Sequence, residues 1–221
     1  HRRQAAGRLF KAFMSKIPVG LLGATGTVGQ RFVELLSHHP WFELTLLAAS
    51  ERSAGKKYGE VVNWMQSGPL VPSLSGAVIK EVLSNELPEF LFSALDSSVA
   101  GPVEAELLKR GHTIVSNARN HRMLPHTPLI VPEANPDHLE LLHKQTLGKI
   151  ACVPNCSTTG LALALKPLHE KFGVEKVHVV TLQAISGAGY PGVASLDIVD
   201  NVIPFIEGEE HKLETETLKI L

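Results

Sequence analysis

A short apolar run at residues 17–22 ends in the glycine-rich turn GATGTVG, and a helical pattern follows directly. An apolar run of this length that stops at a glycine is typical of a buried parallel strand. The helix is expected at residues 27–38, with an apolar face made by Val28, Phe32, Leu35 and Leu36. A second strand is expected at residues 42–48. Strand, glycine turn, helix and strand in this order, within roughly 30 residues, predict a dinucleotide-binding α/β unit.

The following residues continue the alternation of strands and helices. Short apolar runs predict strands at 90–94, 113–116 and 129–131, and helical patterns lie at 99–110 and 136–144. Such alternation indicates a doubly wound, Rossmann-like α/β sheet. After residue 148 we expect a strand at 149–153, a helix at 158–172 and a run rich in β-branched residues at 174–185.

We therefore divide the chain into three parts. They are an appended or leader-like segment at 1–16, a dinucleotide-binding domain at 17–149, and the N-terminal part of an α+β catalytic and dimerisation domain at 150–221. Residues 1–13 are basic, which suits translated upstream sequence or, alternatively, the remnant of an organelle transit peptide. The helical pattern at 214–221 reaches the last residue without a stop signal, so we expect the chain to be C-terminally incomplete.

Composition argues against several classes of protein. A formal net charge of −1 provides no basic surface for nucleic acid, and 44% hydrophobic with 19% charged residues is typical of a soluble globular protein. No apolar run approaches the ~20 residues of a membrane span. The 11 histidines lack the spacing of a metal site, so no metal is expected. Two cysteines are too few for a disulfide framework, which favours a reducing, cytoplasmic location.

The glycines of the turn have separate expected roles. Gly23 allows the tight turn, Gly26 lets a pyrophosphate approach the backbone, and Gly29 lets helix and strand pack closely. The free N–H groups at the start of the helix then face the phosphates. The alternative is a purely structural strand–helix turn, since the spacing is GxxGxxG rather than GxGxxG.

The residues after the second strand bear on the choice of cofactor. An acidic residue there binds the ribose 2′-OH of NAD, whereas arginine accommodates the 2′-phosphate of NADP. Ser50, Arg52 and Ser53 suit a phosphate through two hydroxyls and a guanidinium. Glu51 supports the alternative, because it could be the carboxylate that binds NAD. We favour NADP, with Glu51 turned to solvent.

Cys156 lies in the segment PNCSTTG, where a strand ends and a helix begins. This position favours the thiolate, because the helix dipole and the free N–H groups stabilise negative charge. The same N–H groups, with the Asn155 amide, could stabilise an oxyanion. We therefore predict that Cys156 is a covalent nucleophile, the alternative being an inert buried cysteine, which is what we expect of Cys152 inside the apolar strand.

Two further segments carry polar side chains that suit a small substrate. Gln183 precedes the glycine-rich stretch ISGAGYPG, and its amide could orient a substrate, although a plain surface loop is the alternative. Glu209 and Lys212 are three residues apart, so they share one face of a helix and could bind an amine and an anion. A solvated helix start is the alternative for this pair.

Taken in this order, these segments resemble the aspartate-semialdehyde dehydrogenase family, in particular its archaeal and fungal branch. The resemblance covers residues 17–221 and rests on GATGTVGQRF, ASERSAGKKYGE, SNARNHRM, VPNCSTTG, QAISGAGYPG and EGEEHKLETET. It implies an NADPH-dependent reductive dephosphorylation of 4-phospho-L-aspartate to L-aspartate 4-semialdehyde, on the route to lysine, threonine and methionine. The family resemblance also implies a homodimer or homotetramer.

By this resemblance each site residue takes a role. Cys156 is the nucleophile that forms an acyl-thioester, and Gln183 positions the acyl group. Asn155 and Arg122 hold the phosphate. Glu209 is the ligand of the substrate amine, and Lys212 is a further phosphate ligand. The cofactor contacts are expected at Gly23, Thr25, Gly26, Thr27, Val28, Gly29, Ser50, Arg52, Ser53, Ser186 and Gly187.

One departure from the family pattern concerns the end of the chain. The family uses a histidine as general acid/base and an arginine as carboxylate clamp, both after the EGEEHK segment, and neither appears before Leu221. We therefore expect the chain alone to be inactive or nearly so, since loss of general acid–base catalysis costs about 10²- to 10⁴-fold in rate. Two alternatives stay open, an N-acetyl-glutamyl-phosphate reductase-like enzyme and a non-catalytic NADP-binding or oligomerising fragment.

Overall fold

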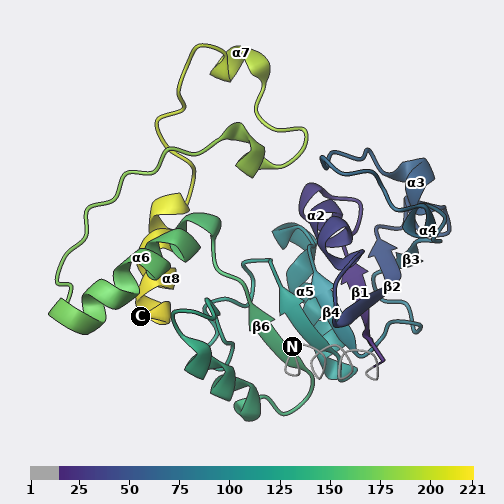
Figure 1. Cartoon of the computed structure of the whole chain (residues 1–221), viewed down its shortest axis with the longest axis horizontal. Helices are drawn as coiled ribbons and strands as arrows, with labels where there is room; N and C mark the ends of the chain where they lie inside the picture. The colour runs from purple at the N-terminus through teal and green to yellow at the C-terminus, as the bar shows by residue number, and fades with distance from the viewer. Residues whose placement is uncertain (1–14) are drawn as a thin grey trace, which may run out of the picture.

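The centre of the structure is a six-stranded sheet with the strand order β3-β2-β1-β4-β5-β6 (Figure 1). The computed structural model describes residues 15–221, so nearly all of the leader-like segment predicted at 1–16 lies outside the described residues. Every neighbouring pair of strands is parallel. The strands are β1 Ile17–Leu22, β2 Phe42–Ala49, β3 Lys80–Glu81, β4 Phe90–Ser93, β5 Thr113–Ser116 and β6 Lys149–Cys152. The chain order reverses between β1 and β4, as in a Rossmann sheet, which confirms the predicted fold class.

Helices connect these strands and continue after β6. They are α2 Thr27–Leu36, α3 Tyr58–Val61, α4 Pro72–Ser75, α5 Ser97–Lys109, α6 Cys156–Phe172, α7 Ser195–Ile198 and α8 Glu209–Ile220, with the 3₁₀ helices η1 Pro136–Lys144 and η2 Ile185–Ala188. The helices expected at 27–38, 99–110 and 158–172 are therefore present, and the helical segment at 136–144 adopts the tighter 3₁₀ form that is common in connections.

The strand expected at 129–131 is reduced to a single bridge, which pairs Leu129 with Cys152. Prolines at 128 and 132 flank this segment. Because proline has no N–H group to donate to a neighbouring strand, the pairing cannot extend in either direction. The segment still lies against β6, since Ile130 donates its N–H to the Cys152 carbonyl at 2.9 Å.

Neighbouring side chains of β1 point to opposite faces of the sheet, so they belong to two separate clusters of buried residues. Leu22 belongs to the cluster that includes Leu107 of α5 and Ile220 of α8. Leu21 belongs to the cluster that includes Val33 of α2 and Tyr58 of α3. The fully buried Tyr58 donates its hydroxyl to the Ala24 carbonyl at 2.8 Å, and burial raises the pKa of this hydroxyl. Thus the second cluster also anchors the turn that follows β1.

The sheet continues past the predicted domain boundary, because β6 reaches Cys152 and pairs with β5. The division at residue 149 stays a prediction. Beyond α6, residues 174–208 leave the body of the molecule as an extended arm that returns to α8 (Figure 1). Of the run rich in β-branched residues at 174–185, residues 174–184 are extended but pair with no strand in the described part of the chain, and Ile185 begins η2. Within residues 15–221, no helix is both long and apolar enough to cross a membrane.

The packing around Gly29 generates a stability prediction. A Cβ at Gly29 would lie 2.2 Å from the Gly23 carbonyl oxygen, whereas a Cβ at Gly160, in α6, would meet no atom within 4 Å. We expect Gly29→Ala to lower the free energy of unfolding by about 1–3 kcal/mol through overpacking. Gly160→Ala is the matched control and should raise it by up to about 1 kcal/mol, as alanine does for glycine in an exposed helix. Urea denaturation measures both, and equal changes in the two variants would contradict the close approach at Gly29.

Candidate functional site

The turn after β1 has the geometry expected of a phosphate-binding turn. Gly23 has φ +76°, and a Cβ there would lie 2.6 Å from the Ala94 carbonyl oxygen, so only glycine fits without strain. The Gly26 N–H donates to the Gly23 carbonyl at 3.2 Å, which closes the turn. Gly26 is the N-cap of α2 and makes no side-chain cap, so the first N–H groups of the helix have no side-chain acceptor. Such N–H groups form a ready site for an anion.

The residues predicted to choose the cofactor follow the neighbouring strand. The Ser53 N–H donates to the Ser50 carbonyl at 2.9 Å, so residues 50–53 form a turn at the carboxyl end of β2. Ser50, Glu51 and Arg52 are exposed. Since β1 and β2 are adjacent and parallel, this turn lies at the same edge of the sheet as the glycine turn. The structure therefore places Arg52 and Glu51 both at the edge, and the preference for NADP stays a prediction.

Cys156 is the first residue of α6, and its side chain is exposed. The N-cap is Asn155, whose side-chain oxygen accepts the N–H groups of Ser157 at 2.9 Å and Thr158 at 3.2 Å. These two N–H groups are therefore unavailable to an oxyanion, and the Cys156 N–H is the donor of the first turn that stays open to one. Cys152, in contrast to the exposed Cys156, is buried in β6, and burial raises the pKa of its thiol to about 12.

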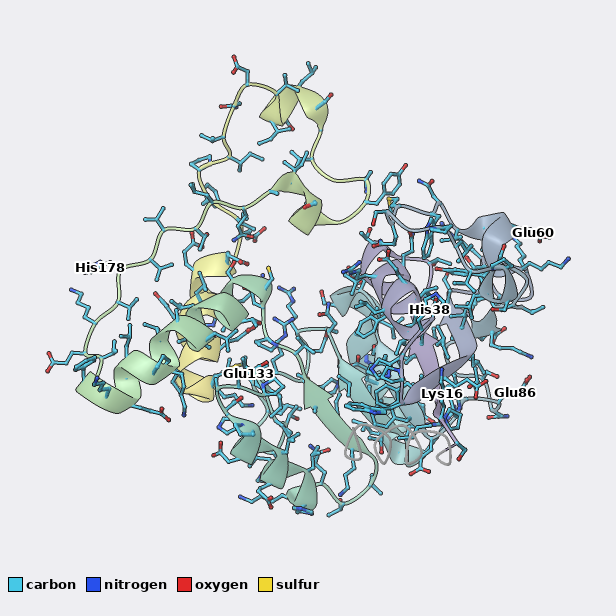
Figure 2. The ribbon with its side chains drawn as sticks, viewed as in Figure 1. Lys16, His38, Glu60, Glu86, Glu133 and His178 are labelled. Carbon is cyan, nitrogen blue, oxygen red and sulfur yellow. The ribbon has the colours of Figure 1, made fainter. Side chains whose placement is uncertain are left out.

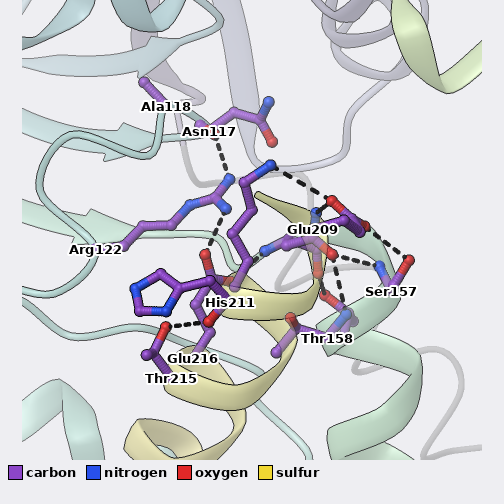
Figure 3. Close-up of polar contacts among 12 residues, drawn as sticks. Asn117, Ala118, Arg122, Ser157, Thr158, Glu209, His211, Thr215 and Glu216 are labelled. Carbon is purple, nitrogen blue, oxygen red and sulfur yellow. Dashed lines mark hydrogen bonds and ion pairs between the residues drawn. The ribbon is translucent and has the colours of Figure 1, made fainter. Parts of the chain in front are cut away.

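Four of the predicted site residues, Glu209 itself with Asn155, Gln183 and Lys212, meet at the carboxylate of Glu209, which Figure 3 labels. Its oxygens accept hydrogen bonds from Asn155 Nδ2 at 3.1 Å, Gln183 Nε2 at 3.1 Å and Lys212 Nζ at 3.4 Å. Ser157 Oγ adds a fourth, at 3.2 Å. Burial alone would raise the pKa of Glu209, but the hydrogen bonds from Gln183 and Asn155 and the charge of Lys212 together lower it. Glu209 is thus held as a carboxylate against Asn155 and Ser157, the two residues that flank Cys156 in the chain.

Arg122 also reaches this region, but its guanidinium is engaged with protein groups. Nη1 donates to Glu216 Oε1 at 2.9 Å, and Nη2 donates to the Asn117 carbonyl at 2.8 Å. The other oxygen of Glu216, which Figure 3 labels with Arg122, accepts the backbone N–H of Asn155 at 2.7 Å. Arg122 is therefore linked to the Cys156 turn through Glu216, and its predicted contact with phosphate stays a prediction.

Ser186 and Gly187 lie in η2, on the exposed arm. The hydrogen bonds found for this turn in the described structure are local, such as Gly187 N–H to the Ala184 carbonyl at 3.2 Å. The structure thus gives no contact between these two residues and the glycine turn. Their cofactor role stays a prediction.

Two residues of the site were not predicted, Ser157 and Glu216. A signal for Glu216 was present in the sequence, because Glu209, Lys212, Glu216 and Lys219 recur at intervals of three and four residues. Such spacing places all four on one face of a helix. A stripe of charge on the same face as a binding pair indicates that this face meets other polar groups rather than solvent alone.

A cavity of about 750 Å³ lies elsewhere, beside the amino-terminal half of β2. Its lining includes Lys16, Leu44 and Glu86, and Figure 2 shows the two charged residues at the end of the sheet remote from the arm. Ligands of open α/β sheets bind at the carboxyl ends of the strands, so this cavity is not the site described above. No group of three His, Cys, Asp or Glu side chains suited to a metal ion occurs within residues 15–221.

Known proteins match the chain over most of its length. Two family models match it, "semialdehyde dehydrogenase, NAD binding domain" over residues 18–142 and "semialdehyde dehydrogenase, dimerisation domain" over 165–221. The aspartate-semialdehyde dehydrogenase of Saccharomyces cerevisiae is 50% identical over 91% of this chain and 59% of its own length. That of Archaeoglobus fulgidus is 49% identical over 92% and 61%.

A solved structure also resembles the chain. The crystal structure of aspartate semialdehyde dehydrogenase with NADP from Candida albicans has a TM-score of 0.83 at 43% identity, covering 93% of this chain and 60% of that one. The chain thus spans about 60% of the length of the relatives that it matches.

The contrast between the two cysteines predicts selective labelling. At pH 8 a thiol with a pKa of about 12 is a thiolate in roughly one molecule in 10⁴, and Cys152 is also buried. We expect iodoacetamide to label Cys156 at least about a hundredfold faster, measured by peptide mass spectrometry over time. Urea-unfolded chain is the control and should show similar rates at both cysteines. Equal labelling in the folded chain would contradict the assignment of Cys156 as the accessible nucleophile.

Proposed function

Because the chain belongs to the semialdehyde dehydrogenase family, we propose that it forms the nucleotide-binding and nucleophile-bearing part of an NADP-dependent aspartate-semialdehyde dehydrogenase. The reaction is reductive dephosphorylation of 4-phospho-L-aspartate to L-aspartate 4-semialdehyde, a step of lysine, threonine and methionine biosynthesis. The observation that carries the proposal is the meeting of Asn155, Gln183 and Lys212 on the Glu209 carboxylate, next to the exposed thiol at the start of α6.

The first chemical step belongs to Cys156. Its thiolate attacks the acyl carbon of the substrate, a C–S bond forms, the bond from carbon to the phosphate oxygen breaks, and phosphate leaves. We assign the stabilisation of the negative charge that develops on the acyl oxygen to the backbone N–H of Cys156, the first residue of α6, together with the Asn155 amide. The product of this step is an acyl-thioester on Cys156.

The residues around Glu209 hold the substrate during this step. Glu209 receives the substrate ammonium group, and its lowered pKa keeps it negatively charged at neutral pH. Lys212 and Asn155 attract the phosphate group, and Gln183 orients the acyl group with its amide. Because Glu209 contacts both Asn155 and Lys212, the amine and the phosphate would be bound by adjacent groups near the start of α6. Holding the substrate at two points in this way would keep the reacting carbon near sulfur, and such positioning is a major source of rate acceleration.

The residues of the glycine turn fit a dinucleotide. The uncapped N–H groups of α2 can hold the pyrophosphate, Gly26 leaves its backbone accessible, and Arg52 with Ser50 can hold the 2′-phosphate. When bound, the reduced nicotinamide supplies the hydride that converts the thioester to the aldehyde.

We further propose that copies of the protein associate as a homodimer or homotetramer through residues 165–221, which match the dimerisation model. A reducing compartment such as the cytoplasm suits an exposed nucleophilic thiol.

The acyl transfer can be tested without the second half-reaction. Incubation with 4-phospho-L-aspartate in the absence of NADPH should add one aspartyl group to Cys156, found by peptide mass spectrometry and released by hydroxylamine. Cys156→Ala is the control and should gain no such group. No adduct after an incubation long enough to offset the rate loss of up to about 10⁴-fold that is expected without the general acid/base, or an adduct on Cys152 instead, would overturn the proposal. Acylation by N-acetyl-γ-glutamyl phosphate in preference to the aspartyl compound would assign the chain to the reductase-like alternative.

Gly26 offers a test of the cofactor site that leaves the fold intact. A Cβ at this position would meet only the Gly23 carbonyl oxygen, at 3.6 Å, and its φ of −72° suits any residue. We expect Gly26→Ala to lower the free energy of unfolding by no more than about 1 kcal/mol, since alanine is a poorer N-cap than glycine. NADP affinity should fall about tenfold or more, because the methyl group intrudes where the pyrophosphate meets the backbone. Fluorescence titration with NADPH measures it, and unchanged affinity would favour the purely structural role of the turn.

A further inference from the structure

Glu216 holds together two loops that are far apart in the sequence. Its carboxylate accepts Arg122 Nη1 at 2.9 Å and the Asn155 N–H at 2.7 Å, across 94 and 61 residues of chain. The side chain is almost fully buried, at 3% exposure. A carboxylate with two charge-assisted or short hydrogen bonds, shielded from water, is held in one orientation.

The backbone N–H that Glu216 binds belongs to the residue directly before the nucleophile. Asn155 caps α6 through its side chain, and the same side chain donates to Glu209. Glu209 and Glu216 both belong to α8. The helix therefore fixes Asn155 twice, at its amide group through Glu209 and at its main chain through Glu216.

Lys219, also on α8, binds the loop that carries Arg122. Its ammonium group donates to the carbonyls of Arg122, of Leu124 at 2.8 Å and of Thr127 at 2.9 Å. Lys219 and Glu216 are adjacent on one helix face. Together they attach the loop at 117–127 and the turn at 153–156 to a single rigid element.

We propose that Glu216 is a positioning residue, which sets the orientation of the Asn155–Cys156 turn and holds the Arg122 guanidinium beside it. This inference rests on the proposed function, because its role is to align the groups that receive an acyl phosphate. The charged groups that surround Asn155 are Arg122, Glu209, Lys212 and Glu216. Glu216 offsets the charge of Arg122, so the pair contributes geometry rather than net charge.

Glu216→Gln tests this role. Arg122 and Asn155 bind different oxygens of the Glu216 carboxylate, and glutamine replaces one of these oxygens by an NH₂ group, which donates and cannot accept. One of the two hydrogen bonds is therefore lost. We expect acylation of Cys156 by 4-phospho-L-aspartate to slow about tenfold or more, as misplacement of reacting groups by an ångström costs up to about 10²-fold. Alkylation by iodoacetamide, which needs no alignment with Asn155 or Arg122, should change less than about threefold when it is measured well above the pH at which its rate is half maximal.

Controls separate positioning from loss of folding. Glu214→Gln removes an exposed carboxylate from the same helix and should leave both rates unchanged. Cys152 should stay unlabelled in the Glu216→Gln variant, since it reports on the sheet. If that variant does not fold, Glu216→Asp keeps the charge and the pair with Arg122 but is one methylene too short to reach Asn155 as well. The aspartate variant should then show the same slow acylation.

A second measurement does not depend on the acyl chemistry. Replacing Glu216 by glutamine leaves Arg122 uncompensated beside the turn, so the pH at which alkylation of Cys156 reaches half its maximal rate should fall, whereas Glu214→Gln should not move it. Wild-type chain that takes no aspartyl group, with this shift present, would overturn the proposed function and support the positioning role. Unchanged acylation and an unchanged pH midpoint in Glu216→Gln would overturn the positioning role.

Discussion

The common direction of the six strands determines where chemistry can occur in this molecule. In a parallel sheet every strand ends at the same edge, so loops that are distant in sequence gather there. The glycine turn follows β1, the serine-rich turn follows β2, the loop with Arg122 follows β5, and the Cys156 turn follows β6. Each loop starts from a strand whose side chains are buried in the sheet, and α8 packs against two of the loops, the one with Arg122 and the one with Cys156.

The sequence pattern within a few residues was sufficient to predict the turns and helix starts, because their backbone geometry depends on the residues at those positions. The glycine turn and the start of α6 were found because φ > 0 at Gly23 and the cap at Asn155 leave direct marks in the sequence. The strand predicted at residues 129–131 is only a single bridge, and the prolines on either side, which have no N–H group to donate, were the signal in the sequence that its pairing would be short. The partner of Arg122 could not be predicted. Helical spacing shows that Glu216 shares a face with Glu209, but not which loops that face will meet.

The junction of α8 with the sheet edge concentrates polar groups in a buried place. Arg122, Glu209 and Glu216 are each less than one-tenth exposed, and Arg122 Nε is buried without a hydrogen-bond partner. Buried ion pairs add little net stability compared with apolar packing, since desolvation offsets their attraction. An apolar junction of the same size would hold α8 at least as firmly. What charged groups add is direction, because hydrogen bonds specify angles that apolar contacts do not.

The span of the Arg122–Glu216 pair has a consequence for how the protein is made. Its two residues are 94 positions apart, whereas the last strand of the sheet ends at Cys152. During synthesis from the amino terminus, the sheet can therefore form before α8 has left the ribosome. In that interval the thiol at the start of α6 is present, but α8 does not yet lie against the turn that carries it. The nascent chain thus passes through a period in which the Cys156 thiol is accessible to oxidants before the side chains of Glu209 and Glu216 have reached its neighbour Asn155.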